Sequence, residues 1–166
     1  GELGHITIDP NGPSCPCGNH GCLQQLATGP AMEQEARVLL RSGRNSSIYP
    51  NPNYDMQLIK VLDICRAADE QDELSMEVVK KAATYMGIAM GNLVNILNPE
   101  VIILGGNIPA HCQYYVKIAE EVMRQRAMSP LTSNNVVTQA SQTQLGGALG
   151  AANFALDLNM GYSLFV

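Results

Sequence analysis

Three cysteines and a histidine near the start of the chain have the residue types and spacing of a metal site. Cys15, Cys17 and Cys22 fall within eight residues, and His5 stands ten residues before the first of them. Three thiolates and one imidazole complete the tetrahedral shell of Zn²⁺, which leaves no open position for a catalytic water. The pattern therefore predicts a structural zinc ion that holds a knuckle over residues 5–23.

Disulfide bonds are the competing interpretation of clustered cysteines, and the sequence argues against them. The chain has five cysteines, an odd number, and a disulfide across a C-x-C pair would be strained. The sequence shows no signal peptide and no apolar run of membrane length, so nothing in it indicates an oxidising compartment or a membrane. Cys65 and Cys112 stand alone in apolar stretches, where a small buried hydrophobe is the expected role. Spacing leaves open whether His5 or His20 is the fourth ligand.

The composition is that of a globular protein. Hydrophobic residues make up 46% and charged residues 15%, and the formal net charge is −5. Basic residues are scattered, so we expect no direct nucleic-acid binding by this segment. The 166 residues allow one domain or half of a larger two-lobed protein. Because the chain opens at Gly1 inside a motif, without a methionine, we expect it to be the C-terminal part of a longer polypeptide.

Hydrophobic periodicity predicts an alternation of helices and strands, and hence an α/β fold with a partly parallel sheet. Strands are expected at residues 5–9, 101–104 and 136–137. Steps of three and four residues between apolar positions predict a long helix over 75–97. Further helices are expected over 31–42, 56–68, 114–126 and 146–158. The polar residues 43–55 are expected to form a mobile surface loop.

The longest expected helix and the strand after it form the predicted core. A stripe of apolar side chains runs along the helix from Val79 to Leu97, and Asn98-Pro99 ends it. The run Val101-Ile102-Ile103-Leu104 is β-branched and apolar, which predicts a strand covered on both faces. The strand at 136–137 is likewise expected to be buried.

Two motifs together resemble the signature of the ROK family of bacterial repressors and sugar kinases. They are Glu2-x-Gly4-His5 and Cys15-x-Cys17-Gly18-x-x-Gly21-Cys22, and the run from Asn98 to Gly106 also resembles the family's strand and glycine pair. The resemblance spans essentially the whole chain. It implies a ribonuclease-H-like (actin-like ATPase) fold, with residues 1–166 as the C-terminal lobe that carries the zinc knuckle. The N-terminal lobe and any DNA-binding domain would then lie outside this sequence.

The resemblance also implies roles for individual residues. Glu2, His5 and Gln24 would bind the sugar, and Gly105 and Gly106 would form part of the adenosine-binding surface. The family usually has glutamate at the position of Gln24, so a charge-assisted hydrogen bond becomes a neutral one. The phosphate-binding loop and the aspartate general base are not in this sequence, which leaves no catalytic residue in the chain.

The function implied for the intact protein is ATP- and Mg²⁺-dependent phosphorylation of a hexose or amino sugar, with this fragment inactive by itself. The alternative is a sugar-responsive transcriptional repressor of the NagC or xylose-repressor type. A third interpretation is a truncated lobe that dimerises but neither phosphorylates nor represses. In each case we expect a cytoplasmic protein, a homodimer that binds a small sugar and does not associate with membranes.

Overall fold

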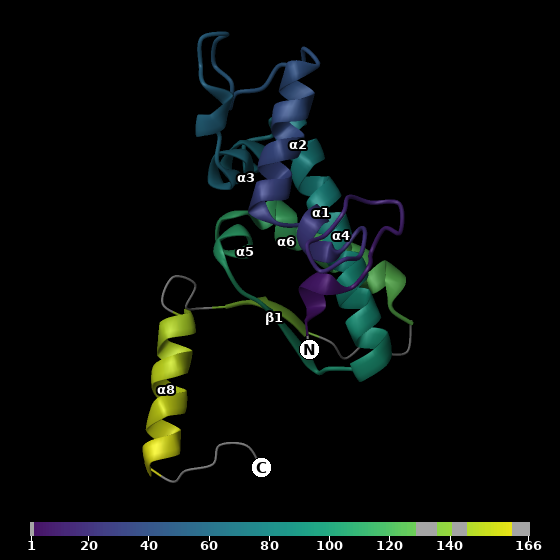
Figure 1. The fold of residues 1–166 in the computed structure, drawn as a ribbon, viewed down its shortest axis with the longest axis vertical. Helices are drawn as coiled ribbons and strands as arrows, with labels where there is room; N and C mark the ends of the chain where they lie inside the picture. The colour runs from purple at the N-terminus through teal and green to yellow at the C-terminus, as the bar shows by residue number, and fades with distance from the viewer. Residues whose placement is uncertain (1, 129–135, 141–145, 161–166) are drawn as a thin grey trace.

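The computed structural model describes residues 2–128, 136–140 and 146–160. A long helix, α4 (Glu73–Leu97), forms its centre (Figure 1). The Asp72 side chain accepts a hydrogen bond from the Ser75 backbone N–H and begins the helix, and Asn98 in the left-handed conformation (φ 44°) ends it. The helix is therefore where periodicity predicts it. Leu97, at the end of the predicted buried stripe, is however 68% exposed. Nearby, the Asn95 side-chain oxygen accepts the Met128 N–H at 2.8 Å.

Other helices pack around α4. Along one side lies α6 (Gln113–Arg126), and α2 (Gly29–Arg41) and α3 (Val61–Asp69) pack against its first half. The helices predicted at 31–42 and 114–126 are confirmed. The helix predicted at 56–68 begins later, at Val61.

The late start of α3 has a local cause. Residues Met56–Leu58 form a separate 3₁₀ turn, η2, which the Asp55 carboxylate caps by accepting the Gln57 N–H. The Asp63 carboxylate accepts the Lys60 N–H, which begins α3 anew.

The two described strands pair in parallel, as expected. Strand β1 (Val101–Leu104) lies beside β2 (Val136–Gln139) with Val101 opposite Val136. The expectation that both faces are covered is wrong for the described residues. Ile103 is 65% exposed, whereas Leu104 is 8% exposed and joins the main core. The described helices around α4 cover one face of this pair, and α8 (Gly146–Met160) stands away from it (Figure 1).

The start of the chain is not the strand predicted at residues 5–9. Leu3–His5 form a 3₁₀ turn, η1, and Thr7 makes a single antiparallel bridge to Cys22, before the short helix α1 (Leu23–Leu26). Ile6 and Ile8 share a face because both pack on a small cluster whose buried members are Leu23, Ala27 and Ala89. Their alternation therefore reflects the packing of a loop on α1 and α4.

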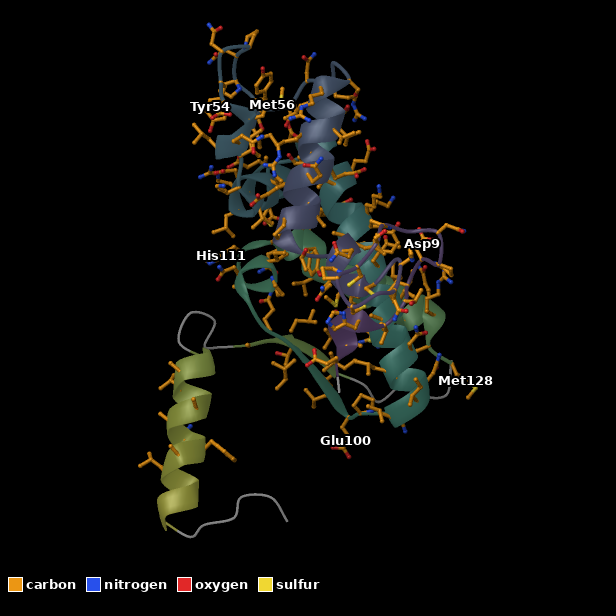
Figure 2. The ribbon with its side chains drawn as sticks, viewed as in Figure 1. Asp9, Tyr54, Met56, Glu100, His111 and Met128 are labelled. Carbon is orange, nitrogen blue, oxygen red and sulfur yellow. The ribbon has the colours of Figure 1, made fainter. Side chains whose placement is uncertain are left out.

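The predicted loop 43–55 contains no regular helix or strand and lies at the end of the molecule away from Glu100 (Figure 2). Its base is tied to the start of α4. The Asp72 carboxylate accepts hydrogen bonds of 2.8 Å from the Ser46 hydroxyl and from the Ser47 N–H. Arg44 pairs with Glu77 at 2.9 Å. None of the helices in the described ranges has the length and apolar character to cross a membrane.

Asp72→Asn is expected to reduce stability at neutral pH by roughly 1–2 kcal/mol. Partial burial acts to raise the pKa of Asp72, but the N–H groups of Ser47 and Ser75 outweigh it and lower the pKa to about 2. The depressed pKa stabilises the folded chain above about pH 4, and this contribution disappears as the pH falls toward 2. Urea unfolding of the wild type and Asp72→Asn across that range should show the difference in their unfolding free energies shrinking as the pH falls. A difference independent of pH would contradict the assignment.

Candidate metal centre and ligand cavities

Four side chains converge at the knuckle in a geometry that fits a tetrahedral metal ion. One donor atom from each of His5, Cys15, Cys17 and Cys22 lies within 4.8 Å of the other three. The distance from Cys15 Sγ to His5 Nδ1 is 3.6 Å, and that from Cys17 Sγ to Cys22 Sγ is also 3.6 Å. A tetrahedron with Zn–S bonds of about 2.3 Å has edges of about 3.6–3.8 Å. Among the described residues, His5 is the histidine that joins the three cysteines, whereas His20 is exposed and lies outside this group.

Two glycines shape the backbone that carries these ligands. Gly18 and Gly21 have φ of +94° and +60°, which favours glycine. A Cβ at Gly21 would lie 1.5 Å from the Asp9 carbonyl oxygen, so only glycine lets the two arms of the knuckle meet. The Gly21 carbonyl in turn accepts the Ile8 N–H at 2.9 Å. The knuckle then rests through Ile6 and Ile8 on Ala89 of α4.

The thiols of the knuckle are electrostatically unlike one another. The Cys17 backbone N–H lowers the pKa of Cys15 to about 6, while burial raises the pKa of Cys22 to about 12. Three crowded sulfurs cannot all ionise without repulsion. A divalent cation removes that conflict, because it stabilises every thiolate at once. The donor set therefore suits zinc in charge as well as in geometry.

Two glutamines of α1 also face the metal group. The Gln24 amide donates to Cys15 Sγ at 3.5 Å, and the Gln25 amide donates to the same sulfur at 3.9 Å. The Gln24 side-chain oxygen lies beside Gly4. The structure thus brings Gln24 together with His5 and Cys15. Gln25 was not a candidate in the sequence, because its contact depends on how α1 packs against the knuckle.

A cavity of about 490 Å³ lies between the knuckle, α1, α2 and α4. Gln24, Gln25 and Tyr85 line it, together with a 2.7 Å ion pair between Lys81 and Glu35. Apolar side chains such as Met32 and Val78 also line this cavity. Of the three residues proposed to bind sugar, Gln24 is on this wall.

The other two sugar candidates lie apart from that cavity. Glu2 is exposed immediately before η1, and His5, partly buried, ends that turn; neither belongs to the cavity lining. The described structure therefore joins His5 to Gln24 through Cys15, and leaves Glu2 at the surface.

A second cavity, of about 340 Å³, lies at the end of β1. Gly105 and Gly106 line it, as do Thr28 and Gly29 from the start of α2 and Tyr115 from α6. Gly106 has φ of +99° and nothing within 4 Å of its Cβ position, so its backbone is open to a ligand. The remaining walls are largely apolar. Thr28 and Gly29 were not candidates, because Gly29-Pro30 reads in the sequence only as a helix start.

Comparisons with known proteins agree on one family. The model of the ROK family matches residues 1–158. The DNA-binding transcriptional dual regulator NagC of Escherichia coli (strain K12) is 31% identical over 156 residues, which cover 94% of this chain and 36% of that protein. A glucokinase of Halalkalibacterium halodurans is 36% identical over 110 residues, 65% of this chain and 33% of that protein.

A solved structure shows the same fold. The ROK hexokinase of Thermus thermophilus superposes with a TM-score of 0.72 and 28% identity, over 96% of this chain and 48% of that one. The chain spans about a third of the length of the two curated relatives. The relatives comprise both a regulator and a kinase.

Proposed function

Since this chain belongs to the ROK family, we propose that it is the C-terminal lobe of a sugar kinase of actin-like fold. The intact protein would transfer a phosphoryl group from ATP, with Mg²⁺, to a hexose or amino sugar. The observation that carries this proposal is the cavity that joins Thr28 and Gly29 to Gly105 and Gly106. It lies at the carboxyl end of β1, where ligands bind in α/β folds.

The chemistry of this cavity suits a nucleoside. Its apolar side chains, among them Met86, Ile108 and Tyr115, can cover the faces of a purine. Gly105 and Gly106 lack side chains, so ribose or phosphate oxygens can reach their backbone. The Thr28 hydroxyl donates to the Gln24 carbonyl at 2.8 Å, which links this cavity to the helix beside the knuckle.

On the sugar side, we propose that the knuckle aims His5 and Gln24 at substrate hydroxyls. His5 Nδ1 faces Cys15, so zinc bound at Nδ1 leaves Nε2–H free to donate. Glu2 would join them as a third sugar ligand. Zinc bound by His5, Cys15, Cys17 and Cys22 would supply structure, since its shell has no place for substrate.

The resemblance implies that the general base lies outside this chain, so we expect no sugar phosphorylation by this chain alone. Catalysis would need the phosphate loop and aspartate of the preceding lobe. We further propose that the intact protein is a cytoplasmic homodimer. Phosphorylation by the purified chain would contradict the assignment of its residues to binding only.

A sugar-responsive repressor is the second candidate, and two observations favour it. The match to NagC covers 94% of this chain, and the resemblance implies that Gln24 stands where the family usually has glutamate. A sensor needs to bind a sugar but not to activate it, so a neutral hydrogen bond can suffice.

The deciding experiment uses the intact protein from which this chain comes. ADP release would be followed with a coupled assay over a panel that includes glucose, N-acetylglucosamine and xylose. Turnover with at least one sugar supports the kinase. No turnover with any sugar, together with loss of DNA binding when a sugar is added, would establish the repressor instead.

Gln24→Glu is expected to tighten sugar binding by the intact protein about fivefold. A carboxylate accepts a stronger hydrogen bond from a hydroxyl than an amide does, by about 1 kcal/mol. Isothermal titration calorimetry with the preferred sugar measures the change. Gln125→Glu is the matched control, because it adds the same charge at an exposed position of α6 outside both cavities and should leave the affinity within about twofold. Equal effects of both variants would show a general charge effect and contradict a direct contact by Gln24.

A further inference from the structure

Two cysteines outside the knuckle are buried side by side. Cys65 of α3 and Cys112, between α5 (Asn107–His111) and α6, are both 0% exposed. The Cys112 thiol is 3.9 Å from the Cys65 carbonyl oxygen, and each thiol lies close enough to shift the pKa of the other. They are separated by 47 positions in the sequence and meet because α3 contacts both α5 and α6. Neither has a role in the proposed sugar or zinc site.

We propose that Cys65 and Cys112 form a redox-active dithiol, which hydrogen peroxide or a low-molecular-weight disulfide converts into an internal cross-link between α3 and the start of α6.

The position of Cys112 makes it the attacking thiol. It directly precedes the first residue of α6, a helix of 14 residues, where the Tyr115 backbone N–H acts to lower its pKa. Hydrogen bonding from Cys65 lowers the pKa of Cys112, and the same bond raises that of Cys65. The Asp69 carboxylate accepts the Gln113 and Tyr114 N–H groups at this helix end, and its negative charge acts to raise the pKa of Cys112.

The oxidation balances with peroxide as the only co-reactant. The Cys112 thiolate attacks one peroxide oxygen, the O–O bond breaks, and a sulfenic acid and hydroxide form. The Cys65 sulfur then attacks the Cys112 sulfur and displaces the hydroxyl group. The two thiols lose two electrons and two protons in total, which reduce H₂O₂ to two molecules of water.

The cross-link would act on the cavity at the end of β1. Val61 lies one helical turn before Cys65, Tyr115 lies one turn after Cys112, and both line that cavity. Pro109 of α5 is a third lining residue. A covalent bond between the two cysteines therefore ties together two of the elements that line this cavity, α3 and the start of α6.

The test is a tryptic map of the zinc-loaded chain after treatment with hydrogen peroxide, in parallel with oxidised glutathione, and alkylation of the remaining thiols. Cys65 falls in the peptide 61–66, Cys112 in 82–117, and all three knuckle cysteines in 1–37. The expected result is a dithiothreitol-sensitive species that joins 61–66 to 82–117, lost in Cys65→Ser. Recovery of both peptides unlinked, linked to 1–37, or each carrying its own glutathione would overturn the proposal.

Discussion

Replacing Cys22 with alanine is expected to weaken zinc binding by more than about 100-fold and to unfold the knuckle over residues 5–23. The Cys22 side chain is fully buried and its sulfur lies 3.6 Å from that of Cys17. Loss of outer-shell partners alone costs roughly 10–100-fold in metal affinity, so loss of a direct ligand should cost more. Structural zinc contributes roughly 10–16 kcal/mol in isolated fingers, so the remaining packing is not expected to hold the knuckle.

Metal content by elemental analysis after gel filtration, and competition with a fluorescent chelator, measure this effect. Cys65→Ala is the matched control: it removes an equally buried thiol outside the metal group and should retain stoichiometric zinc. Zinc retained by Cys22→Ala at wild-type affinity would contradict the proposed ligand set.

The same measurement decides between the two histidines. His5→Ala is expected to lose zinc as Cys22→Ala does, whereas His20→Ala should keep it, because His20 is exposed and outside the group. Release of zinc by His20→Ala alone would reverse the assignment.

Gly87→Ala is expected to destabilise the chain by about 3 kcal/mol or more. A Cβ at Gly87 would lie 2.6 Å from the Ala119 carbonyl oxygen and 2.6 Å from Val122 Cβ. One of these two atoms belongs to the backbone and the other is fixed directly to it, so the clash can be relieved only by moving α4 and α6 apart along a close interface. Urea unfolding followed by circular dichroism gives the change in free energy.

Two further glycines in helices calibrate this prediction. Gly91→Ala should have a smaller effect, because the nearest atom, Arg126 Cβ, is farther away at 3.0 Å. Gly150→Ala in α8 meets nothing within 4 Å and should leave stability unchanged or raise it by up to about 1 kcal/mol. If Gly87→Ala and Gly150→Ala gave equal stabilities, the close α4–α6 contact would be wrong.

Signals local in sequence predicted this fold well. The spacing of apolar residues placed α4, the β-branched run placed β1, and the cysteine spacing selected a group that the structure brings within 4.8 Å. In each case the deciding interaction is between residues close along the chain, or is set by residue chemistry alone.

Features that depend on neighbours in space were not predictable in the same way. The apolar residues of β1 give no sign of which face the helices cover, and Ile103 proved to be exposed. The pair Ile6 and Ile8 alternates like a strand but packs on Ala89 of α4. Thr28 becomes part of a cavity only because the start of α2 lies beside the end of β1.

The glycine contact between α4 and α6 has a mechanical consequence for the two ends of the molecule. Because Gly87 brings α4 into contact with the backbone of α6, we expect the two helices to move together. Met86 of α4 packs against the small cluster of Leu23, Ala27 and Ala89 and also lines the cavity at the end of β1. We therefore expect a ligand that displaces Met86 in this cavity to change the affinity of the knuckle for its metal, and thermodynamic reciprocity requires the metal to change the affinity for that ligand by the same factor.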